Sequence, residues 1–327
     1  MASTRRSSGE PAVGSDSSRQ LELFDGPHLV RQRAIGQILD AQPDAALRTL
    51  AEDDPRHHAD EWQALRALAH AVAAALTEIG ERPRDPRGAL ASQSAILSAL
   101  ARDRARLPAS AASRLHAALH ASALAAASGL RPPFLDDGTP LGWLALEAGD
   151  PDRARELLFA ARDARPADGR VLGYLGDAFA LAGRRAEAAA SYRDALYHDP
   201  GGIDAAAIRD EGLRELLAED EGEPDWRLPR ACIAGVLPVG SAAMPIAGER
   251  PAAIFRALLA DGAEPTSALE RARLFYLGMV LGGSGASARG SSGVAELGEV
   301  RAAMKRASPT LFADYMRWLR ARLDLPL

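Results

Sequence analysis

Two histidines, His116 and His120, stand four residues apart in a segment whose pattern predicts a helix. This spacing places both imidazoles on one helical face, where they could bind one metal ion together. A protein metal site needs at least one further ligand, and none follows at a suitable spacing. Leu115 and Leu119 adjoin the histidines and indicate a stripe that faces a core. We therefore expect a packed helix without a metal.

A second histidine pair, His57 and His58, precedes Asp60 and Glu61. Carboxylates in the first turn of a helix complement its dipole, so we interpret these residues as a helix start rather than a zinc site. Cys232 is the only cysteine, which excludes an internal disulfide and a zinc site built on cysteines. A chain with one cysteine fits a reducing cytosol.

The Gly/Ser-rich stretch 282–293 contains Arg289 and could suggest a loop that cradles phosphate. It lacks the G-x-G-x-x-G order and follows a helical pattern, so a connector is the better interpretation. Lys305 is the only lysine, and no glycine run precedes it. P-loop and Schiff-base chemistry both need a lysine in a defined setting, so the sequence argues against both classes.

No G-x-S-x-G or H-E-x-x-H motif occurs in the chain. We therefore predict a protein that is not an enzyme, with no catalytic residue, cofactor or metal. The first residues lack the apolar stretch of a signal peptide, and no uncharged run is long and unbroken enough to span a bilayer. We expect a cytoplasmic protein without a membrane segment.

Hydrophobic residues make up 47% of the 327 residues, but aromatic residues only 5%, so alanine and leucine must build most of the core. Nearly all positive charge is carried by arginine, which indicates a GC-rich and therefore bacterial genome. The net charge of -5 gives no support for a nucleic-acid partner.

The hydrophobic pattern predicts helices over most of the chain, after a disordered tail at residues 1–19. We expect an irregular or extended piece at 226–248. The expected helices cover residues 28–40, 43–53, 59–81, 87–107, 109–129, 203–219, 251–259, 267–281, 294–307 and 309–323.

Residue identity or size recurs at an interval of 34 positions in the middle of the chain. The pairs are Leu141 and Leu175, Gly142 and Gly176, Gly149 and Gly183, Ala154 and Ala188, Leu158 and Tyr192, Ala161 and Ala195, and Pro166 and Pro200. A fixed period of this length is typical of helix-turn-helix units that stack to bury their apolar faces.

Residues 138–200 resemble two tetratricopeptide repeats. The second unit carries the family pattern at Leu172, Leu175, Gly176, Phe179, Ala188, Tyr192, Ala195 and Pro200, with Leu172 in place of the usual tryptophan. In this pattern Gly142 and Gly176 leave room where two helices approach, and Gly149 and Gly183 allow a tight turn. Leu158 and Tyr192 are expected to fill the space between units.

The resemblance implies a scaffold that holds a peptide or helix on a concave face lined by the first helix of each unit. The family's carboxylate clamp uses Lys, Arg and Asn, whereas this chain has Trp143, Gly173 and Asp177 at those places. A partner with apolar anchors and basic residues therefore fits better than an acidic chain terminus. The residues that we expect to contact this partner are Trp143, Glu147, Arg170, Tyr174 and Asp177.

The predicted fold is all-α: a tetratricopeptide-like α-solenoid over residues 20–220, followed by a smaller, mostly helical C-terminal domain over 221–327. An acidic cluster around Pro224 marks the expected boundary. The expected role is a scaffold or adaptor, chaperone-like in its mode of binding, as an accessory subunit of a bacterial multiprotein system.

Two other functions stay open at this point. Residues 301–327 carry a net charge of +4, so the C-terminal domain could contact nucleic acid in a regulator whose repeats sense a protein or peptide. Alternatively, residues 226–327 could hold an enzyme site that no motif identifies.

Overall fold

The computed structural model describes residues 27–52, 59–99, 101–102, 105, 107, 109–219, 223–240, 251–259, 265–283 and 297–323. Within these ranges every regular element is a helix, and an isolated β-bridge pairs Phe134 with Pro140. The predicted tail, His57, His58 and Arg289 lie outside the described residues. None of the described helices is long and apolar enough to cross a bilayer.

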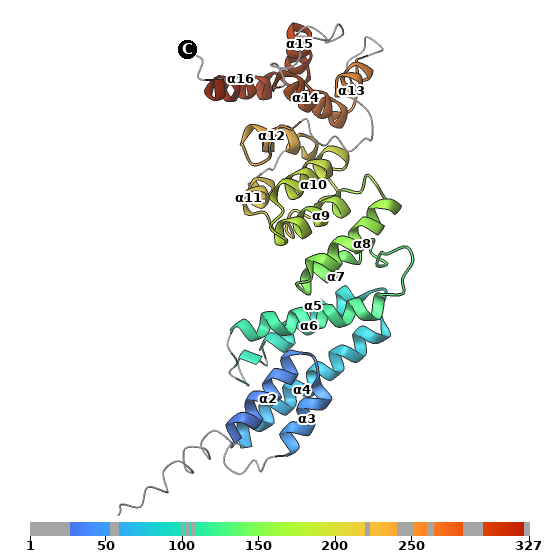
Figure 1. Ribbon diagram of the computed structural model, residues 1–327, viewed down its shortest axis with the longest axis vertical. Coiled ribbons are helices and arrows are strands. Elements are labelled where there is room, and N and C mark those ends of the chain that lie inside the picture. Colours follow the sequence, from blue (N-terminus) through green and yellow to red (C-terminus); the bar gives the residue numbers. More distant parts are fainter. Residues whose placement is uncertain are drawn as a thin grey trace, which may run out of the picture. The chain divides into compact units, whose positions relative to one another are not determined.

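The chain separates into two compact units, one up to Ala127 and one from Ser128 onward (Figure 1). The first unit contains α2 (Pro27–Leu39), α3 (Pro43–Ala51), α4 (Ala59–Glu81), α5 (Pro86–Ala99) and α6 (Ala109–Ala127). The core-facing stripe of α4 is fully buried and runs through Trp62, Leu65, Leu68, Ala69 and Val72.

The second unit begins with two helix pairs, which are α7 (Gly142–Glu147) with α8 (Pro151–Ala164) and α9 (Gly169–Leu181) with α10 (Arg185–His198). It continues through α11 (Glu211–Glu219), the short 3-10 helix η3 (Pro224–Trp226) and α12 (Arg227–Ile233). Its last helices are α13 (Pro251–Ala257), α14 (Ala268–Gly283), α15 (Leu297–Ala307) and α16 (Pro309–Leu323).

Glycines set the geometry of the two helix pairs. Gly149 and Gly183 end α7 and α9 with φ of 80° and 74°, as the tight-turn prediction requires. A Cβ on Gly142 would overlap the Leu158 side chain, and one on Gly176 would overlap the Tyr192 ring. Leu158 and Tyr192 therefore fill space inside each pair, whereas the prediction placed them between units.

Helices α12 and α14, which follow residue 220, contact α10 of the second helix pair. The Phe275 ring on α14 meets Trp226 and Tyr315 edge-on, with centroids 6.1 Å and 6.3 Å away. Arg273 donates from Nε to the Tyr197 carbonyl over 2.8 Å and from Nη2 to the His198 carbonyl over 2.9 Å. The boundary expected near residue 220 thus falls inside the second compact unit.

Candidate functional site

The face lined by α7 and α9 is covered at α9 by residues 201–210, which we name the groove segment. The prediction of a helix over 203–219 is wrong for this part, because α11 begins only at Glu211. Pro200 precedes the segment, Gly201 and Gly202 begin it, and all three oppose a continuous helix. The chain therefore crosses the face in an irregular conformation with turns before it becomes helical again.

Apolar contacts hold the groove segment on a glycine of α9. A Cβ on Gly173 would lie 3.0 Å from Cγ1 of Ile203 and 3.6 Å from Cδ1 of Ile208. Both isoleucines are buried, with 6% and 1% of their surface exposed. A glycine inside a helix costs about 1 kcal/mol relative to alanine. Here it allows the groove segment to approach the helix closely.

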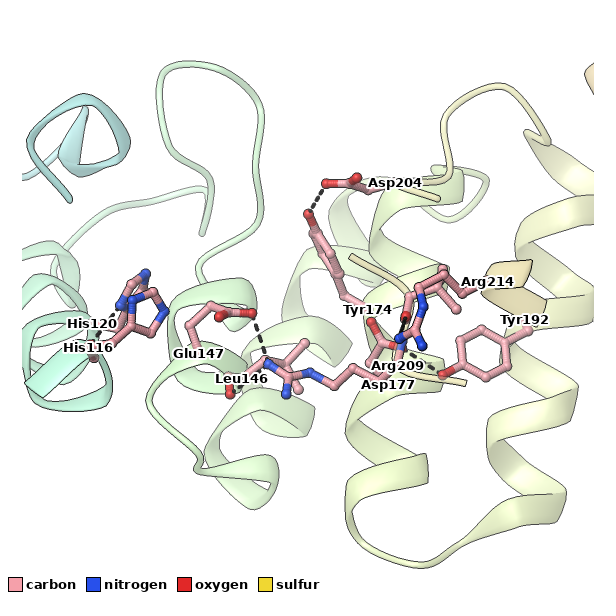
Figure 2. A network of polar contacts seen from close by, with 11 residues as sticks. His116, His120, Leu146, Glu147, Tyr174, Asp177, Tyr192, Asp204, Arg209 and Arg214 are labelled. Carbon is pink, nitrogen blue, oxygen red and sulfur yellow. Dashed lines mark hydrogen bonds and ion pairs between the residues drawn. The ribbon is translucent and has the colours of Figure 1, made fainter. Parts of the chain in front are cut away.

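Polar contacts fix the same segment at three points (Figure 2). The Tyr174 hydroxyl donates to Oδ2 of Asp204 over 2.9 Å. Oδ1 of Asp177 accepts the backbone N–H of Arg209 over 2.8 Å. The Arg209 guanidinium donates to Oε1 of Glu147 over 2.9 Å, which joins the segment to α7.

Asp177 is almost fully enclosed, with 1% of its surface exposed. Its Oδ1 also accepts the Tyr192 hydroxyl over 2.6 Å. Burial raises the pKa of Asp177 to about 6, although the bonds from Tyr192 and Arg209 act to lower it. Burial and the nearby Asp177 carboxylate together raise the pKa of Tyr192. The charged form of Asp177 is thus held by donors rather than by water.

Residues 139–203 match the family model of the tetratricopeptide repeat. These residues are therefore similar to tetratricopeptide repeats. No curated protein and no solved structure matches the chain. The matched segment ends at residue 203, within the groove segment, which crosses the face lined by α7 and α9 instead of forming the first helix of a further repeat.

Three of the five residues expected to contact a partner form hydrogen bonds with the groove segment instead. Glu147, Tyr174 and Asp177 each bond to it, and both Tyr174 and Asp177 are buried beneath it. Trp143 is partly exposed on α7. Arg170 is half-buried at the start of α9, where Nη1 donates to Oγ1 of Thr139 over 3.5 Å.

The site contains residues that the sequence analysis did not single out, chiefly Asp204 and Arg209. Their side chains act on the repeats only because the chain leaves its helical course after Pro200. The signal for this break is the run Pro200, Gly201 and Gly202, together with Gly173 on the repeat helix beneath.

The histidine pair of α6 is held by local contacts. Nδ1 of His120 lies 2.8 Å from the His116 carbonyl oxygen, and the two rings are 4.0 Å apart between centroids. Within the described ranges, no three histidine, cysteine or carboxylate side chains come together in a way that could hold a metal ion.

Proposed function

We propose that the chain is a non-catalytic protein-protein interaction scaffold that binds an extended segment of a partner protein on the concave face of its tetratricopeptide repeats. Repeats of this family mediate protein-protein interaction in general. The observation that supports this face is the groove segment itself, an irregular stretch of chain that Tyr174, Asp177 and Glu147 hold.

The contacts of the groove segment define the chemistry of the partner. A partner segment would place apolar side chains on Gly173, where Ile203 and Ile208 now pack. It would accept a hydrogen bond from Tyr174 and offer a backbone N–H to Asp177. A basic side chain would pair with Glu147, as Arg209 does. Trp143 and Arg170 would extend the contact along α7 and α9.

In this proposal the partner displaces the groove segment. Two isoleucines and a few hydrogen bonds hold the segment, and each such bond contributes about 1 kcal/mol net, so displacement lies within the free energy of an ordinary protein complex. The proposed setting is the bacterial cytoplasm, with the chain as an adaptor or accessory subunit of a multiprotein system.

A peptide in trans tests the proposal. The probe is a fluorescein-labelled peptide with the sequence of residues 200–212, and fluorescence anisotropy measures its binding to the full chain. The double variant Ile203→Ser/Ile208→Ser weakens the internal segment and should bind the peptide more tightly than the unchanged chain. Ala206→Ser, at an exposed residue of the same segment, is the matched control and should bind as the unchanged chain does.

A second peptide, with serine at both isoleucine positions, should bind none of the proteins. Circular dichroism checks that the double variant keeps its helix content. If the folded double variant does not bind the native peptide, the segment is a permanent part of the repeat fold and the proposal for the concave face is wrong.

A further inference from the structure

A hollow of about 760 Å³, which we name the outer groove, lies on another side of α9. Its lining includes Leu172, Leu175 and Phe179 of α9, which share one helical stripe. Gly173 and Asp177, which contact the groove segment, belong to a different stripe of the same helix. The outer groove is therefore separate from the concave face.

Aromatic and small side chains from the flanking helices form the walls of the outer groove. Phe159 of α8 meets Phe179 edge-on, with ring centroids 6.2 Å apart. The guanidinium of Arg162 lies 4.8 Å from the Phe159 centroid and that of Arg184 lies 4.8 Å from the Phe179 centroid. Among the residues of α10 that line the groove is Ala190, which has a small side chain.

Asp194 of α10 lines this groove without a partner for one of its oxygens. Its Oδ1 is buried and has no hydrogen-bond partner among the described residues. Burial raises the pKa of Asp194 to about 7, although the charges of Arg193 and Arg162 act to lower it. A buried acceptor that lacks a donor costs about 1–3 kcal/mol.

The other charges at the groove are already balanced or absent. Asp163 pairs with Arg162 at 4.0 Å, and Glu187 pairs with Arg184 at 2.7 Å. Burial and the charge of Arg273 lower the pKa of His198, so its imidazole is neutral at neutral pH. Asp194 is thus the group of this groove with which a cationic side chain of a partner would pair.

We propose that the outer groove binds a segment of a partner protein that is apolar except for one arginine, whose guanidinium pairs with Asp194. Apolar side chains would cover Leu172, Leu175 and Phe179, and the aliphatic stem of the arginine would continue that contact. The torsion of a carboxyl group about its last bond is broad, so either oxygen of Asp194 can turn toward the cation. Binding releases the Asp194 proton to solvent wherever that proton is present.

Two matched peptides test this site. One is a short helical peptide of alanine, glutamine and leucine with one arginine on its leucine face, and the other has citrulline, a neutral isostere, at that position. Calorimetric titration should show about tenfold tighter binding of the arginine peptide, as one charge-assisted hydrogen bond gives. Asp194→Asn should abolish this preference and leave the affinity for the citrulline peptide unchanged.

Asp163→Asn is the matched control, since it removes an exposed carboxylate from the same groove and should keep the preference. The affinity for the arginine peptide should also rise with pH through about 7 in the unchanged chain and stay flat in Asp194→Asn. Equal affinities for the two peptides, or a preference that survives Asp194→Asn, would overturn the inference. The concave-face experiment uses a different peptide and different variants, so the two proposals fail independently.

Discussion

Tyr192 and Asp177 come from the two helices of one repeat and share a hydrogen bond of 2.6 Å. The Tyr192 ring packs over Gly176. Oδ1 of Asp177, which accepts the hydrogen bond from the Tyr192 hydroxyl, also accepts one from the backbone N–H of Arg209. The packing inside the repeat and the attachment of the groove segment therefore depend on the same carboxyl group. A substitution of either residue should weaken both the contact between α9 and α10 and the attachment of the groove segment.

The raised pKa of Asp177 should make stability depend on pH. The folded state keeps the proton up to about pH 6, whereas the unfolded chain loses it near 3.8, so stability falls as pH rises between these values. The expected loss is on the order of 3 kcal/mol, since one pKa unit corresponds to about 1.4 kcal/mol. Asp177→Asn keeps an acceptor for both donors and should remove the share of this slope that belongs to Asp177, as urea unfolding at a series of pH values would measure.

Asp194 provides an internal reference in the same experiment, because its pKa is raised to about 7. The fall in stability between about pH 6 and pH 7 should therefore persist in Asp177→Asn and disappear in Asp194→Asn. A slope below pH 6 that is unchanged in Asp177→Asn would assign the titration to another group.

The helix contact inside the second repeat should not tolerate one added methyl group. In Gly176→Ala the new Cβ would overlap the Tyr192 ring, which must then move and strain its bond to Asp177. We expect a loss of about 1–3 kcal/mol in the free energy of unfolding, which is the usual effect of overpacking. Thermal unfolding followed by circular dichroism measures this loss.

Gly36→Ala is the control for Gly176→Ala, since Gly36 lies inside α2 and a Cβ there meets nothing within 4 Å. This substitution should stabilise the protein by up to about 1 kcal/mol, because alanine is the better helix former. If Gly176→Ala gains stability as Gly36→Ala does, the Tyr192 ring does not oppose the added methyl group and the overpacking argument is wrong.

The bond from Tyr174 to Asp204 should contribute to holding the groove segment. Tyr174→Phe and Asp204→Ala each remove it, so the double variant should be less harmful than the sum of the two. The expected coupling is about 1–2 kcal/mol, as for a hydrogen bond to a charged group. Hydrogen exchange of the Arg209 amide, which bonds to Asp177, reports the opening of the segment. Strictly additive effects would show that Tyr174 and Asp204 act separately.

The helices were predictable where local patterns decide them. The bounds expected for α4 and α16 agree with the structure, because a continuous apolar stripe runs between clear stop signals at both. The repeat was predictable because its glycines recur at a fixed interval and face a larger side chain in each unit. In both cases the deciding contacts lie within one helix or one helix pair.

The groove segment was not predictable from such patterns. Residues 203–219 have a composition that favours a helix. The run from Pro200 to Gly202 signals a break, and the contact with Gly173 on another helix shows why the irregular part extends to residue 210. The same contact buries Tyr174 and Asp177, which would be exposed on a free concave face. The contact between the groove segment and Gly173 thus decides which of the expected site residues are accessible to a partner.

Arg273 of α14 acts on α10 in two ways, through hydrogen bonds and through its charge, and two variants should distinguish them. Its two bonds to the carbonyls of Tyr197 and His198 hold the end of α10, so Arg273→Ala should cost about 3 kcal/mol. Burial first, and then the charge of Arg273, lower the pKa of His198. The contribution of His198 to stability therefore rises with pH up to about 6.5, where the unfolded chain also loses the proton, and it opposes the contributions of Asp177 and Asp194.

Arg273→Lys divides these two effects, because lysine keeps the charge but lacks the fork that reaches both carbonyls. We expect this variant to lose much of the stability and to keep the lowered pKa of His198. Arg273→Ala should lose the stability and raise the pKa of His198 part of the way toward its ordinary value, since burial remains. NMR titration of the His198 imidazole measures the pKa, and urea unfolding measures the stability. If the pKa stays equally low in Arg273→Ala, burial alone sets it and the guanidinium acts only as a hydrogen-bond donor to α10.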